Sequence, residues 1–436
     1  MKDQYQSAAT QSQVSSSWYS WFTLVIVSLF FFYEYGLNNI FNSLEEPLSA
    51  AFHLNSVEIG FISSIYFYSN IIFLIPAAIL LDRFSPRNLI SVAMLVCSSA
   101  VLAVALTHSV WVLAISRFVM GIGGGFCVIG CMRIAASWFP STKMARASSI
   151  VVAVGMIGGF VVQLPVTVLI NHFGWREATG MFAGLGYVIT IVIFWIVRDV
   201  PKHYQARFTA HRQELHQLGI WNSIKVVFSN RQNWSCALFA SMINLPIYIV
   251  GALWGIPFLM EVHHLSNTDA ATISSMLFLG TLVGCLAVGA LSDLIRRRKL
   301  PMLLGVFASM VLIYMILNGS AFSFWTLLIL FFLLGVSTSV QVLSYPTVTE
   351  SNPRMVASTA VSVLSISFMV VGAVGQPLFG KLLSLGWTGA MAHGVPVYDA
   401  HHYLFAMNIL PIAFVLSLIG VLLIKETRCT RALVKN

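Results

Sequence analysis

Two charged residues stand inside long apolar runs of this chain, where ionised groups are costly to bury. Glu34 lies about eight residues from the end of the run 18–42, and Arg117 lies about seven residues into the run 110–136. At roughly 1.5 Å per residue the two side chains have nearly equal depth if both runs are membrane-crossing helices. A carboxylate whose proton affinity depends on water and on a nearby guanidinium can take up and release a proton. Glu34 is the candidate proton carrier, and Arg117 would modulate it or bind an anionic group; a static buried ion pair is the alternative.

The elements that must position these residues are twelve apolar runs. The chain of 436 residues is 58% hydrophobic and 9% charged, against about 25% charged in soluble domains. A soluble interior of this size cannot hide so much apolar surface, whereas about 20 apolar residues suffice to cross a bilayer. The sequence therefore predicts an all-α membrane protein with twelve transmembrane helices, at residues 18–42, 56–81, 87–107, 110–136, 145–170, 177–197, 234–260, 269–291, 300–318, 322–346, 354–384 and 402–424.

The basic residues predict the orientation of these helices. With the N-terminus placed in the cytoplasm, 20 of the 24 Lys and Arg residues fall in cytoplasmic segments, as the positive-inside rule requires. An even number of helices puts both termini on that side. The net charge of +9 then reflects orientation, and no basic and aromatic patch of the kind that binds nucleic acid is present.

An internal repeat divides the chain into two sets of six helices. Asp82 and Asp293 occupy matching places after the second and eighth runs, 211 positions apart. Gln163 follows Pro140 by 23 positions, and Gln376 follows Pro353 by the same 23. Duplicated six-helix halves place a solute site between them, near the midplane. We expect a tail at 1–17, an N-terminal bundle at 18–197, a cytoplasmic linker at 198–233, a C-terminal bundle at 234–424 and a tail at 425–436.

These repeated segments resemble the major facilitator superfamily, whose signature after helix 2 is Gly-x-Leu-x-Asp-Arg-x-Gly-Arg-Arg. The first copy here departs from it at Ala78, Ser85 and Pro86. The resemblance implies two pseudo-symmetric six-helix halves, alternating access and a charged conformational latch; the alternative is that these charges only set the topology. The latch residues implied are Asp82, Arg83 and Arg87 in the first copy and Asp293, Arg297 and Arg298 in the second.

Shorter motifs resemble particular branches of that superfamily. Trp138-Phe139-Pro140 and Gly174-Trp175-Arg176 are similar to motifs of organic-anion and metabolite symporters. Trp254-Gly-Ile-Pro257 is similar to a motif of bacterial phagosomal nutrient transporters, which carry amino acids or nucleosides. Both likenesses imply a bacterial inner membrane protein.

The same resemblance implies which polar residues face the solute path, because helices 1, 4, 7 and 10 line it in this superfamily. A membrane Asn or Gln can instead bond a neighbouring helix, and a Tyr near a helix end can belong to the interfacial belt. The substrate-binding candidates on helices 1, 7 and 10 are Tyr35, Asn38, Asn244, Trp254, Gln341 and Tyr345, and helices 5 and 11 add Gln163 and Gln376.

The predicted function is secondary active transport of a small polar metabolite, an amino acid, nucleoside or organic anion, by proton-coupled uptake. Proton-driven efflux of drugs or a siderophore-like metabolite is the alternative, and a non-transporting sensor would need a degraded latch or an added domain. No nucleotide-binding loop, catalytic motif or metal-ligand spacing is present. We therefore predict no enzyme activity, no cofactor and no metal, with protons, a small-molecule substrate and the lipid bilayer as the partners of a monomer.

Overall fold

The structure is a computed structural model that describes residues 18–139, 141–197, 220–319, 322–353, 356–387, 389–392 and 395–428. Inside these ranges the side chains of a few helical residues, Asp82 and Arg83 among them, are not described. The predicted tail at 1–17, residues 429–436 of the predicted tail at 425–436, and residues 198–219 of the predicted linker lie outside the described residues.

Six long helices form the N-terminal half, joined by short connections. Polar residues start some of them: the Asn55 side chain and Glu58 form a capping box, and Ser85 caps a helix that begins with Pro86. The helices are α2 (Trp18–Phe52), α3 (Ser56–Arg83), α4 (Pro86–Leu106), α5 (Val110–Trp138), α6 (Ser141–Phe173) and α7 (Trp175–Ile196).

The C-terminal half repeats this arrangement with three of its spans broken. The seventh span changes from α-helix to π-helix and back, the tenth passes through a 3-10 turn, and the twelfth is divided at Asn408. The elements are α9 (Ile220–Ser229), α10 (Arg231–Ile243), η3 (Ile247–Trp254), α11 (Gly255–His263), α12 (Asn267–Ile295), α13 (Lys299–Asn318), α14 (Phe324–Thr338), η4 (Ser339–Leu343), α15 (Ser344–Glu350), α16 (Ala357–Ser384), β1 (Met391–Ala392), β2 (Val395–Pro396), α17 (Ala400–Met407) and α18 (Ile409–Leu423).

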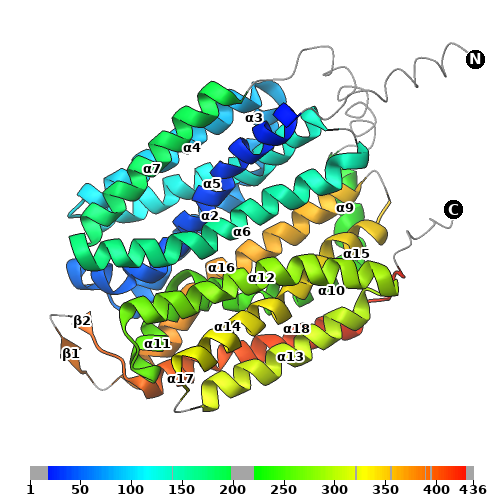
Figure 1. The fold of residues 1–436 in the computed structure, drawn as a ribbon. Helices are drawn as coiled ribbons and strands as arrows, with labels where there is room; N and C mark the ends of the chain where they lie inside the picture. The colour runs from blue at the N-terminus through cyan, green and yellow to red at the C-terminus, as the bar shows by residue number, and fades with distance from the viewer. Residues whose placement is uncertain are drawn as a thin grey trace, which may run out of the picture.

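The two halves lie side by side as separate helical bundles (Figure 1). We call the end of the molecule where α2 begins and α18 ends the proximal end. The opposite end, where α2 turns into α3 and the β1–β2 hairpin lies, is the distal end.

Across the boundary between the halves, α3 packs along α16 and α6 packs along α12. Small residues allow the close approach of α3 and α16. A Cβ atom at Gly380 would lie 2.1 Å from the carbonyl oxygen of Ser56, and one at Gly60 would lie 2.8 Å from that of Gln376. Such small-residue contacts are how helices associate where lipid removes the hydrophobic driving force between them.

The predicted fold class is confirmed, because twelve helical spans in the described part of the chain are long and apolar enough to cross a membrane. Some details differ from the prediction. The first span was expected to end at residue 42, before Glu45, Glu46 and Pro47, but α2 continues to Phe52. Its polar end is covered by the other half, with Glu45 and Ser49 buried, so it needs no apolar surface toward lipid. The short α9 inside the expected linker and the β1–β2 hairpin were not predicted.

Candidate functional site

Glu34 lies at the centre of the N-terminal half, on α2, and is 6% exposed. Its room comes from Gly124 of α5. A Cβ atom there would lie 2.7 Å from Glu34 Oε1 and 2.6 Å from both the Tyr66 hydroxyl and Asn70 Nδ2. The glycine therefore opens a space in which the carboxylate sits among polar groups of α3.

Arg117 of α5 is fully buried beside Tyr66. Its Nη2 donates to the Ser63 carbonyl at 2.8 Å, and its guanidinium carbon lies 3.9 Å from the centre of the Phe41 ring and 5.2 Å from that of Tyr66. Nε and Nη1 have no hydrogen-bond partner among the described residues. Arg117 is close enough to interact electrostatically with Glu34, but the two side chains do not form a direct ion pair in the described chain.

Three tyrosines from both halves meet near this carboxylate. Tyr35 of α2, Tyr248 of η3 and Tyr345 of α15 are close enough to interact electrostatically with one another, and Glu34 acts on Tyr35 and Tyr248. All three side chains remain partly exposed. The site therefore presents aromatic rings and hydroxyl groups at the boundary between the halves, beside a buried carboxylate.

Four further residues predicted to bind the substrate differ in their exposure. Asn38 of α2 and Gln341 of η4 stay partly exposed, and Asn244 lies one turn before Tyr248. Trp254 is fully buried, with its ring 5.3 Å from that of Phe379. In this conformation Trp254 packs in the interior and faces no open space.

The π-helix η3 receives side-chain amides from three other helices. Gln163 of α6 approaches the Gly251 carbonyl at 3.5 Å and Ser274 Oγ at 3.3 Å, and Gln376 of α16 donates to the Tyr248 carbonyl at 3.1 Å. A π-helical turn leaves carbonyl groups open to such donors, and such turns are frequent at functional sites. The two glutamines of the internal repeat thus both bind the backbone of the seventh span.

Asn42 of α2 makes the most extensive of these contacts. Its Nδ2 lies 2.9 Å from the Val250 carbonyl, 3.0 Å from the Gly251 carbonyl and 3.1 Å from Ser274 Oγ, while its Oδ1 accepts from Ile256 N at 2.9 Å. We refer to these contacts as the Asn42 clamp. The sequence analysis did not select Asn42, although an Asn inside an apolar run was the available signal.

The clamp joins the halves in the distal part of the molecule. Ser56, at the distal start of α3, adds contacts of 2.8 Å to the Gly380 carbonyl and 2.9 Å to the Tyr398 hydroxyl. The distal end is therefore closed in this structure.

The predicted latch residues lie at the proximal end. Arg298 Nη1 contacts Asp293 at 2.7 Å and its Nη2 contacts Glu350 of α15 at 2.9 Å, so the second copy ties α12 to α15 within one half. Arg297 is exposed. Arg87 donates from Nη2 to the Phe194 carbonyl and lies over the Phe194 ring, within the N-terminal half.

The segment after α18 joins this proximal network through Glu426. Its carboxylate accepts from the backbone N–H groups of Arg298 at 2.8 Å and Lys299 at 2.9 Å. Partial burial acts to raise the pKa of Glu426, but the backbone hydrogen bonds from Arg298, Lys299, Arg428 and Thr427 together outweigh it and lower that pKa.

No group of three or more His, Cys, Asp or Glu side chains within the described ranges is placed to hold a metal ion. What the fold and site define is a membrane carrier, with two six-helix halves and a polar site between them. The sequence profile of the Major Facilitator Superfamily matches residues 24–375 and, a second time, residues 236–428. The chain therefore belongs to the Major Facilitator Superfamily, and it is a secondary transporter, not an enzyme.

Relatives of known name are distant. The probable sulfoacetate transporter SauU of Cupriavidus necator is 24% identical over 83% of this chain and 86% of its own length. The probable galactarate/D-glucarate transporter GudP of Escherichia coli is 21% identical over 88% of this chain and 91% of its own. A bacterial homologue of the human lysosomal transporter Spinster, crystallised inward-facing and unoccupied, has a TM-score of 0.77 at 17% identity, over 94% of this chain and 98% of that one. At such identity the structural likeness shows the fold alone.

Proposed function

We propose that this transporter takes up a small polar metabolite by alternating access, driven by protons that bind to and leave Glu34. The observation that carries the proposal is the position of this carboxylate. It is buried at the centre of the N-terminal half, has no ion-pair partner among the described residues, and acts on two tyrosines that face the boundary between the halves. Rearrangement of the halves changes its access to water and its distance from Arg117, and these are the terms that govern proton affinity.

Among amino acids, nucleosides and organic anions, the relatives favour organic anions. SauU and GudP are named for sulfoacetate and for galactarate/D-glucarate, all of them small oxygen-rich anions. Tyr35, Tyr248 and Tyr345 supply hydroxyl donors, with Asn38 and Gln341 as partly exposed amides. Hydroxyl and amide groups suit the carboxylate and hydroxyl oxygens of such solutes.

The distribution of basic residues supports a cytoplasmic proximal end. Both termini would then lie on the cytoplasmic side of a bacterial inner membrane. The residues Arg296 to Lys299 and Lys425 lie at that end. With this orientation the distal closure faces the outside, and the substrate leaves toward the cytoplasm.

A thermal-shift screen of amino acids, nucleosides and organic anions on the purified protein identifies the substrate class, because a ligand that binds the folded state raises its stability by mass action. Transport is then measured in proteoliposomes with an imposed pH gradient. Glu34→Gln abolishes proton-driven accumulation of the screened ligand and preserves exchange of labelled for unlabelled ligand. Glu177→Gln, at an exposed carboxylate of the distal end, serves as the control and keeps both activities. Full accumulation by Glu34→Gln contradicts the proton role.

A further inference from the structure

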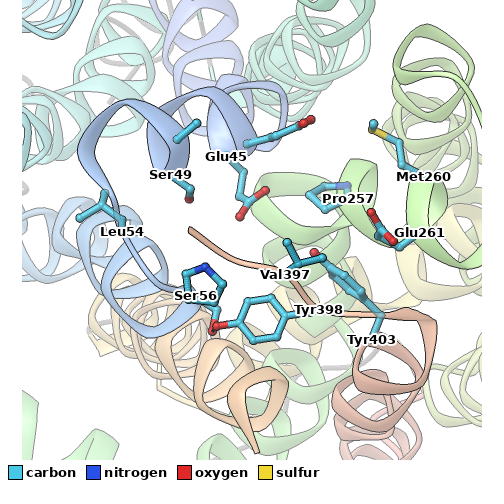
Figure 2. A pocket seen from close by; sticks show the side chains of 13 residues that line it. Glu45, Ser49, Leu54, Ser56, Pro257, Met260, Glu261, Val397, Tyr398 and Tyr403 are labelled. Carbon is cyan, nitrogen blue, oxygen red and sulfur yellow. Dashed lines mark hydrogen bonds between the residues drawn. The ribbon is translucent and has the colours of Figure 1, made fainter. Parts of the chain in front are cut away.

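A pocket with three carboxylates in its lining lies between the halves at the distal end, apart from the site around Glu34. Its cavity volume is about 230 Å³. The walls come from the distal end of α2 with Leu54 and Ser56, from α11, and from the segment that runs from β2 into α17. Figure 2 shows the side chains of Glu45 and Ser49 on one side of this space, Tyr398 across from them, and Glu261 and Tyr403 close together beside it.

The charged side chains that line the pocket are all acidic. Glu45, Glu46 and Glu261 line it, and none of its 13 lining residues is basic. Tyr403 is close enough to interact with all three carboxylates. His264 and Asp399, which are not among the lining residues, also interact electrostatically with Glu261, and these two interactions have opposite signs. Like charges gathered in a partly closed space repel one another unless a cation or protons compensate them.

Two buried polar groups of the pocket, the carboxylate of Glu45 and the hydroxyl of Ser49, make no hydrogen bond of accepted geometry with the described residues. Glu45 is 9% exposed, and no ion pair or hydrogen bond in accepted geometry reaches its carboxylate within the described chain. Ser49, one turn further along α2, is 5% exposed and close enough to interact with the Glu45 carboxylate, but its hydroxyl makes no hydrogen bond of accepted geometry among the described residues. Buried polar groups without partners are rare in folded proteins and call for an explanation. Here both line an open space, so a ligand with N–H donors and a positive charge would satisfy them.

The lining residues and the volume of the pocket favour a small organic cation over a metal ion. The described acidic, His and Cys side chains form no group of three suited to a metal ion. The cavity is smaller than the roughly 300–1,000 Å³ of drug-sized sites, and it holds about seven water volumes at roughly 30 Å³ each. Carboxylates beside tyrosine rings are the groups that bind organic ammonium ions, through charge-assisted hydrogen bonds and cation–π contacts.

We propose that this distal pocket is a binding site for a small organic ammonium ion. The cation occupies the space between Glu45 and Glu261. Its binding involves no transfer of a proton or of charge from the transport site. Because Glu45 belongs to the N-terminal half and Glu261 to the C-terminal half, the bound cation bridges the halves and favours the distal-closed state. A ligand shifts a conformational equilibrium toward the state that it binds better.

The test uses the full chain in lipid nanodiscs, with n-butylammonium as the probe and n-butanol and Mg²⁺ as comparison ligands. Affinity is measured by calorimetry on the wild type, on Glu45→Gln, on Glu261→Gln and on the control Glu177→Gln. We expect n-butylammonium to bind the wild type and the control equally, and each pocket variant at least tenfold more weakly. Glu261 is exposed at its helix end, so Glu261→Gln gives a result even where the buried Glu45 variant fails to fold.

Hydrogen exchange measured on the same samples tests the bridge. With n-butylammonium, the backbone N–H groups of residues 45–50 (other than Pro47) and of residues 258–261 should both exchange more slowly in the wild type, and neither set should change in Glu261→Gln. The proposal is overturned by absence of n-butylammonium binding, by equal affinity in the pocket variants, by equally tight binding of n-butanol, or by binding of Mg²⁺ alone. Slower exchange on only one of the two segments overturns the bridge.

Discussion

The side-chain oxygen of Asn42 accepts a 2.9 Å hydrogen bond from the backbone N–H of Ile256, which lies 214 positions further along the chain. Ile256 is the second residue after the π-helix η3, where the ordinary helical pairing of backbone groups is interrupted. The amide nitrogen of the same side chain binds the carbonyls of Val250 and Gly251. One buried amide therefore supplies both a donor and an acceptor to the irregular backbone of the other half.

Replacing Asn42 with Ala is expected to weaken the distal closure. The Val250 and Gly251 carbonyls keep contacts from Ser274 Oγ at 3.4 Å and Gln163 Nε2 at 3.5 Å. The change leaves the buried Ile256 N–H without its partner, and an unsatisfied buried group costs about 1–3 kcal/mol. Since these contacts exist only while the distal end is closed, a loss of that size shifts the equilibrium about 5- to 150-fold toward the distal-open state. Distances between spin labels on the distal ends of α3 and α12 measure the shift.

Asn39 provides the matched control for this experiment. It lies on the same helix and is equally buried, but its Nδ2 donates to the Tyr35 carbonyl of its own helix. Asn39→Ala should leave the label distances unchanged. Unchanged distances in Asn42→Ala as well would contradict the role of the clamp.

A methyl group at Gly380 is expected to disturb the contact between α3 and α16. Its carbon would lie 2.1 Å from the Ser56 carbonyl oxygen, which is backbone and cannot rotate away. Overpacking of this kind costs about 1–3 kcal/mol, so Gly380→Ala should lower the melting temperature in detergent. Gly289→Ala is the control on another helix of the same half, because a Cβ atom there meets nothing within 4 Å. Equal melting temperatures for the two variants would refute this account.

The two carboxylates that bind Arg298 should contribute unequally to stability. The side chain of Glu350 is 14% exposed and that of Asp293 is 70% exposed, while the Arg298 side chain is 9% exposed. Removing one partner of a buried pair costs about 3–5 kcal/mol, whereas an exposed pair contributes about 0–1 kcal/mol. Chemical denaturation should therefore show a clearly larger loss for Glu350→Gln than for Asp293→Asn. A larger loss for Asp293→Asn would show that the exposed pair dominates.

Glu426 should make the proximal C-terminal contact sensitive to acid. Its pKa is lower in the folded state, where four backbone N–H groups bind the ionised form, than the roughly 4.3 of an unperturbed Glu. The stabilisation is therefore complete above about pH 4.3 and is lost as the pH falls through the folded value. The melting temperature of Glu426→Gln should lie below that of the wild type at neutral pH and converge with it in acid. A difference that grows in acid would reverse the predicted sign.

Much of the architecture could be predicted because membrane insertion depends on local properties of the chain. The length and apolarity of each run predicted twelve spans, and the offset between Asp82 and Asp293 predicted two repeated halves. Helix ends were less accessible. The first apolar run ends at residue 42, but α2 continues to Phe52. The helix can continue because the other half covers its polar turn around Glu45 and Ser49.

The candidate site was only partly accessible from the sequence. Residue type and depth selected Glu34 and Arg117, but not their surroundings, which include Tyr66 from α3 and the space left by Gly124 of α5. The repeat paired Gln163 with Gln376, but not their common acceptor in η3. Asn42 was missed because its partners are backbone groups more than 200 positions away.

The sequence by itself determined the solvent of this protein, its number of spans and its duplicated plan, because transfer of a side chain into lipid is a property of each residue and its near neighbours. Only the tertiary structure decided which buried polar atoms meet. Hydrogen bonds form over about 3 Å, and their partners here come from helices whose relative positions depend on packing across the whole molecule. The buried carboxylate of Glu34 thus followed from the sequence, whereas the amide of Asn42 that closes the distal end followed from the fold.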